Sequence, residues 1–111
     1  MGGSALKTIC TLSLKSGYDP DETYQLWVKD HVPYVKQSTS GIRRYVVGRA
    51  LPNSLTGKEI FGVVQFTYGN LEDAIKAGNR VWAHGPDEFM NRTAIVTRVI
   101  IREKDVMNDP I

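Results

Sequence analysis

The 111-residue chain contains a single cysteine, Cys10. One cysteine cannot form an internal disulfide, and it excludes the zinc sites that are built from several cysteines. No apolar run approaches the roughly 20 residues that a transmembrane helix needs, so no membrane partner is expected. The sequence also lacks a G-x-G-x-x-G loop for binding phosphates. It has only two histidines, without a carboxylate at metal-ligand spacing. We therefore expect no cofactor and no metal.

The chain also carries little net charge. The 14 Lys and Arg residues stand against 12 Asp and Glu residues, which gives a formal net charge of +2. Two excess charges on a whole domain make a weak electrostatic footprint for nucleic acid, so no nucleic-acid partner is expected. Hydrophobic residues make up 41% and charged residues 23% of the chain, which is typical of a globular protein.

The length suits one domain, which we expect over residues 6–104. A flexible leader at 1–5 and a tail at 105–111 would flank it. No signal peptide is recognised at the start of the chain, so we expect a cytoplasmic protein.

Hydrophobic periodicity predicts four strands, at residues 6–14, 42–51, 59–68 and 94–102. A first helix is expected after Asp19, which can serve as its N-cap with Pro20 in the first turn. Pro33 cannot donate a backbone hydrogen bond, so a kink or a break is expected there. A second helix is predicted to start after Asn70, and a short helical piece to end near Arg92.

The resulting order, β-α-β-β-α-β, predicts an α+β, ferredoxin-like fold: a four-stranded antiparallel sheet with two helices on one face. One set of alternating strand residues is apolar and suits the helix-covered core: Cys10, Leu12, Leu14, Ile42, Val46, Val64 and Phe66. The other set mixes apolar and short polar side chains, with few charges: Ile9, Thr11, Ser13, Tyr45, Val47, Phe61, Val63, Gln65 and Thr67. A sheet face in water normally carries more Lys and Glu. We therefore expect a second copy of the chain to cover this face, with a hydrogen-bonding cavity there.

Three motifs are similar to those of one known family. Trp-x3-His-x-Pro at residues 27–33, Gly-Ile-Arg-Arg-Tyr at 41–45 and Gly-Val-Val-Gln-Phe at 62–66 resemble the EthD family of the dimeric α+β barrel superfamily. The resemblance covers residues 7–102. It implies a ferredoxin-like protomer and a homodimer whose two sheets close a barrel. The superfamily includes cofactor-free and haem-degrading monooxygenases, aromatic polyketide cyclases and muconolactone isomerases.

The resemblance also implies roles for individual residues. His31 falls on a histidine that lines the family's pocket as an acid/base candidate, and Tyr45 falls on a tyrosine that faces the same pocket. Gln65 stands where many members carry Glu, and an amide cannot take a proton at neutral pH. Thr67 replaces a frequent Trp, which implies a roomier cavity.

Taken by themselves, the residues leave alternatives open. Histidine exchanges protons near neutral pH, so His31 is the best proton shuttle in the chain; the alternative is a residue that caps a kinked helix. Tyr45 either donates a hydrogen bond to the substrate or is only a lining aromatic. The further candidates for substrate binding are Gln65, Tyr34, Thr11, Val63, Thr67, Phe61, Trp27 and His84. Of these, Trp27 suits a core position equally, and His84 a surface position.

The leading hypothesis is a cofactor-independent lyase or isomerase that acts on an aromatic, polyketide-like or lactone substrate. The reaction would be isomerisation, cyclisation, dehydration or decarboxylation. His31 would move the proton, while Tyr45 and Gln65 would hold the developing oxyanion. Two alternatives stay open: a cofactor-free or haem-using monooxygenase, and a homodimer that binds a small molecule without changing it.

Overall fold

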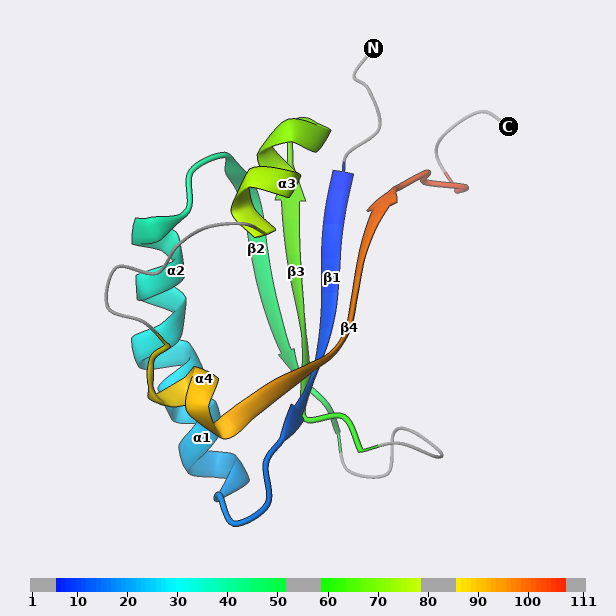
Figure 1. Cartoon of the computed structure of the whole chain (residues 1–111). Coiled ribbons are helices and arrows are strands. Elements are labelled where there is room, and N and C mark those ends of the chain that lie inside the picture. Colours follow the sequence, from blue (N-terminus) through cyan, green and yellow to red (C-terminus); the bar gives the residue numbers. More distant parts are fainter. Residues whose placement is uncertain (1–5, 52–58, 79–85, 108–111) are drawn as a thin grey trace.

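The computed structural model describes residues 6–51, 59–78 and 86–107 (Figure 1). The elements follow in the order β1 (Leu6–Leu14), α1 (Pro20–Leu26), η1 (Trp27–His31), α2 (Val32–Ser38), β2 (Ile42–Arg49), β3 (Gly62–Tyr68), α3 (Leu71–Gly78), α4 (Glu88–Arg92) and β4 (Thr93–Arg102). The strands form an antiparallel sheet in the order β2-β3-β1-β4. The helices lie on one face of it (Figure 1). The predicted ferredoxin-like α+β fold is confirmed. No helix in the described ranges is long and apolar enough to span a membrane.

Side-chain caps define the starts of the helices. The carboxylate of Asp19 accepts a hydrogen bond of 2.8 Å from the backbone N–H of Glu22. The Asn70 side chain accepts one of the same length from the N–H of Asp73. Such caps satisfy N–H groups that have no partner within the helix. Both predicted helix starts are therefore confirmed.

The helix that begins at Pro20 does not break at Pro33. The chain stays helical through α1, η1 and α2. η1 is a π-helical turn, in which the N–H of Val32 donates to the carbonyl of Trp27. Pro33 has no N–H to donate, and a widened turn before a proline lets the helix continue despite the missing bond. Of the two alternatives expected at Pro33, a kink or a break, the break is wrong, and the irregularity in the helical segment is a π turn that ends at His31.

The core lies between the sheet and the helices. Leu12 of β1 and Phe66 of β3 point from the sheet into this layer, and both are buried. Trp27 and Val35 of the helical segment pack against the same cluster, and they are among the least exposed side chains of the described chain. The apolar strand face and the helices therefore share one core.

β2 departs from the predicted alternation. Its pairing with β3 shifts register between Ile42 and Arg44, and Tyr45 beyond the shift pairs with Phe66 of the core face. An irregularity that adds one residue to a strand reverses which side the following residues face. Three predicted assignments are therefore corrected. Tyr45 and Val47 lie on the helix-covered face, and Val46 lies on the second face.

Phe61 is a further correction, because it precedes β3 and is buried on the helix side. Its ring centroid lies 5.8 Å from that of Trp27. The residues of the second face that the structure confirms are Ile9, Thr11, Ser13, Val63, Gln65 and Thr67, each of intermediate burial. On this face the hydroxyls of Thr11 and Thr97 lie 2.6 Å apart across β1 and β4.

Candidate functional site

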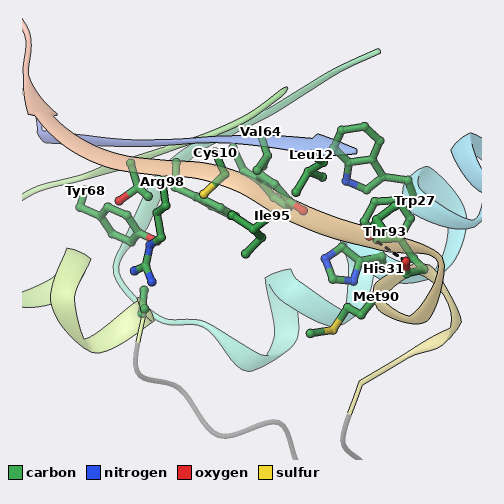
Figure 2. Close-up of a pocket in the computed structure, with 16 residues that line it drawn as sticks. Cys10, Leu12, Trp27, His31, Val64, Tyr68, Met90, Thr93, Ile95 and Arg98 are labelled. Atoms are coloured by element: carbon green, nitrogen blue, oxygen red, sulfur yellow. Dashed lines mark hydrogen bonds between the residues drawn. The ribbon is translucent and has the colours of Figure 1, made fainter. Parts of the chain in front are cut away.

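A cavity of about 360 Å³ lies between the sheet and the helices (Figure 2). Its volume falls within the usual range for ligand pockets, about 300–1,000 Å³. Small side chains at Cys10, Ala77 and Gly78 line it, and their size leaves room between the two layers. This cavity lies on the helix-covered face, whereas the cavity expected from the sequence lies on the second sheet face, against a second copy of the chain.

His31 stands at one end of the cavity (Figure 2). Its side chain is 13% exposed, and its Nδ1 atom lies 2.6 Å from Oδ2 of Asp87. Its ring also packs against Phe89, with the centroids 4.8 Å apart. The orientation of the imidazole is thus held by a carboxylate and by an aromatic ring.

Asp87 is a site residue that the sequence analysis missed. Its Oδ1 accepts a hydrogen bond of 2.8 Å from the backbone N–H of Met90 and so caps α4, while its Oδ2 meets His31. Since a carboxylate only accepts hydrogen bonds, a hydrogen bond at this contact is donated by Nδ1 of His31. The sequence shows an Asp before a short helical piece, so the cap is predictable from neighbouring residues. The contact with His31 is not, because it joins residues 56 positions apart.

Arg92 fastens α4, and with it Asp87, to the rest of the protein. Its guanidinium lies 2.9 Å from the carboxylate of Glu88 and 3.1 Å from that of Glu22 at the start of α1. It also lies 5.0 Å from the ring centroid of Tyr18. The hydrogen bond from Arg92 to Glu88 is the main cause that raises the pKa of Arg92, with Glu22 adding to it and desolvation opposing it. Arg92 therefore stays charged at any assay pH.

Trp27 forms part of the cavity wall and of the core at once. It is 1% exposed, and its ring stacks on Phe89 with the centroids 5.1 Å apart. A Cβ added at Gly62 would lie 2.5 Å from the Trp27 ring, so glycine is required there for the close approach. The core position of Trp27 is therefore confirmed, and its role in substrate binding stays a prediction.

The other end of the cavity is formed by Arg98 of β4 and Tyr68 of β3 (Figure 2). Arg98 was also missed by the sequence analysis, although it stands out as the one charged side chain inside the apolar run 94–101. β4 shifts register against β1 between Thr11 and Leu12, so simple alternation does not predict which face Arg98 takes.

The structure brings together only some of the predicted site residues. His31, Tyr45 and Trp27 line the cavity, and Phe61 packs behind Trp27. Alternate strand residues point to opposite sides of a sheet, so the polar residues of the second face do not reach it. The residues placed outside the cavity are Thr11, Val63, Gln65 and Thr67 on that face, and Tyr34 on α2. His84 lies outside the described residues.

Among residues 6–51, 59–78 and 86–107, no three His, Cys, Asp or Glu side chains are grouped to hold a metal ion. The single cysteine, Cys10, is buried on the sheet side of the cavity.

No protein-family model and no curated protein sequence matches the chain, but solved structures do. An EthD family protein from Bacillus halodurans has a TM-score of 0.64 at 14% identity, over 90% of this chain and 99% of that one. An EthD-like protein from Ralstonia eutropha has a TM-score of 0.62 at 21% identity, over 92% and 93%. HapK from Hahella chejuensis has a TM-score of 0.64 at 13% identity, over 89% and 92%. The chain therefore has the ferredoxin-like fold of the EthD proteins, as its motifs predict.

Proposed function

We propose that the protein is a small-molecule enzyme that moves a proton with His31. The observation that carries this proposal is the His31–Asp87 pair, which stands at one end of a cavity of ligand size. A histidine whose second nitrogen is held by a carboxylate is a common arrangement for general acid/base catalysis. The carboxylate orients the ring and stabilises the imidazolium that forms when the ring takes a proton.

In the proposed reaction, Nε2 of His31 takes a proton from a carbon or a hydroxyl group of the substrate. The imidazolium then returns this proton to another atom of the substrate or to a leaving group. Such a sequence gives isomerisation, cyclisation, dehydration or decarboxylation, without a net change of oxidation state. It is the chemistry of a cofactor-independent lyase or isomerase.

Tyr45 is the proposed donor to the oxygen that gains negative charge. Its ring stacks on Phe66, with the centroids 4.7 Å apart and an interplanar angle of 20°, so a bound substrate meets a fixed phenol. Tyr45 also lines a second hollow together with Val32, the residue that follows His31. Gln65 has no part in this step, because it lies on the other face of the sheet.

The lining of the cavity supports an aromatic, polyketide-like or lactone substrate. Aromatic rings enclose it from several elements, with Trp27 and Phe89 from the helices and Phe66 and Tyr68 from β3. Flat, apolar substrates bind well against such walls, while a few polar groups fix their orientation.

We also propose that two copies of the chain associate through the second sheet face. Val63 and Ile9 lie half-buried there among short polar side chains, and no described helix covers this side (Figure 1). A closed dimer would remove these apolar groups from water.

The function can be tested by proton exchange. A panel of aromatic acids, polyketides and lactones is incubated with the protein in D2O, with and without O2, and analysed by mass spectrometry. Turnover or deuterium incorporation is expected without O2. It is expected to disappear in His31→Gln but to persist in Lys29→Gln, a matched change of an exposed residue on the same helical turn. A strict need for O2, or ligands that bind and stay unchanged, would overturn the proposal.

A further inference from the structure

The cavity has two chemically different ends. Thr8, Cys10 and Leu12 of β1 line the cavity one after another. Cys10 pairs with Arg98 of β4, and Leu12 pairs with Ile95, which is nearer the His31 end. Thr8 therefore belongs to the Arg98 end. The four residue steps from Thr8 to Leu12 span roughly 13 Å at about 3.3 Å per step along a strand. A ligand that fills the cavity is thus elongated, and one of its ends meets a cation.

Arg98 is available for a ligand. It forms no ion pair with any carboxylate of the described residues. A Cβ at Gly78 would overlap the Arg98 guanidinium, so this glycine supplies the space in which the head group lies. Arg98 is itself exposed, which keeps this end of the cavity in contact with water.

Thr8 is a second, independent indication of a ligand at the same end. The residue is 3% exposed, and its hydroxyl has no hydrogen-bond partner among the described residues. A buried hydroxyl without a partner reduces stability. An oxygen of a bound molecule would satisfy it.

The charge of the site indicates the ligand class. A guanidinium binds a carboxylate through two parallel hydrogen bonds. Among the described residues that line the cavity, Arg98 is the one Lys or Arg, and one cation balances one negative charge. A phosphate ester carries about −1.5 to −2 charges at neutral pH, so more than one cation is needed to balance it. Between Arg98 and His31 the wall is apolar, with Cys10, Val64 and Ile95 (Figure 2).

We infer that the cavity takes an elongated, apolar monocarboxylic acid, with its carboxylate on Arg98, an oxygen near Thr8 and its reacting end at His31. The last part of this inference rests on the proposed function. The carboxylate site stands on Arg98, Gly78 and Thr8 alone, and can be measured by binding without turnover.

The test compares 5-phenylpentanoate with its primary amide by isothermal titration calorimetry. The two probes differ in charge and share the apolar body. The wild type is expected to bind the acid more tightly. Arg98→Gln should weaken binding of the acid about tenfold or more and leave the amide almost unchanged. Gly78→Ala should act in the same direction, because it displaces the guanidinium while the charge stays. Arg102→Gln is the matched control, on the same strand outside the cavity.

Equal affinity for acid and amide, equal losses for both in Arg98→Gln, or no binding of either probe at millimolar concentration would overturn the inference. His31→Gln separates it from the proposed function. If the inference is correct, this variant keeps the preference for the acid. If instead the variant prefers the acid and also retains full turnover of the wild-type substrate, the proposed function fails and the carboxylate site stands.

Discussion

The Nδ1 atom of His31 lies 2.6 Å from Oδ2 of Asp87, and Oδ1 of the same carboxylate caps α4. One side chain therefore fixes both the start of a short helix and the orientation of the imidazole. Arg92 completes the arrangement, because it joins α4 to the start of α1 through Glu88 and Glu22. The geometry around His31 thus depends on contacts outside the cavity.

Asp87→Asn separates the two tasks of this side chain. Asn caps helices about as well as Asp, so the melting temperature should change little. Its amide lacks the charge that stabilises an imidazolium and favours the wrong tautomer of the ring. Turnover should therefore fall about 10²–10⁴-fold, mainly in kcat. Steady-state kinetics of the single variants and of the double variant with His31→Gln measure this. Losses that simply multiply in the double variant would contradict a shared role.

Replacement of His31 should remove the chemistry and spare the fold. His31→Ala is expected to lower turnover about 10²–10⁴-fold, which is the usual contribution of one general acid/base. His31→Gln should be nearly as poor, because glutamine forms hydrogen bonds but does not titrate. A fully active His31→Gln enzyme would count most strongly against the mechanism.

Tyr45→Phe tests the proposed oxyanion donor. The phenyl ring keeps the stacking on Phe66, so the shape of the cavity is retained and only the hydroxyl is lost. Turnover is expected to fall roughly tenfold to a few hundredfold, with little change in KM. Kinetics with the same substrate and a thermal melt measure the two effects. A Tyr45→Phe enzyme with wild-type kcat would show that the hydroxyl does not act in the reaction.

Thr8→Val should have opposite effects on stability and on binding. Without a ligand, the change removes a buried hydroxyl that has no partner among the described residues, so the free energy of unfolding should rise by up to ~1–3 kcal/mol. With 5-phenylpentanoate, the variant loses a hydrogen bond and should bind several-fold more weakly. Urea unfolding and calorimetry measure the two quantities. A destabilised Thr8→Val protein would show that the hydroxyl is satisfied in the free protein.

Val63→Lys tests the association of two copies. Val63 lies half-buried on the second sheet face, where an unpaired lysine would cost several kcal/mol in a closed dimer. Light scattering at micromolar concentration should give a dimer mass for the wild type and a monomer mass for the variant. Val28→Lys, on an exposed part of η1, should remain dimeric. A monomeric wild type would contradict the proposed assembly.

The sequence by itself determined the order of the elements and the starts of α1 and α3. A helix cap such as Asp19 or Asn70 acts on a backbone N–H three residues away, so neighbouring residues suffice to predict it. The strands follow from alternation over a few residues, and their order leaves few topologies. His31 could be selected as a site residue because histidine exchanges protons near neutral pH and because the Trp-x3-His-x-Pro motif is formed by neighbouring residues.

Only the tertiary structure decided which face of the sheet carries the cavity. The register shifts in β2 and β4 reverse the alternation, and they place Tyr45 and Arg98 on the helix side. A bulge forms where two strands pair, so one strand's sequence does not reveal it. The contact of Asp87 with His31 has the same origin. It joins residues 56 positions apart, and it exists because α4 packs beside η1 once the sheet has formed.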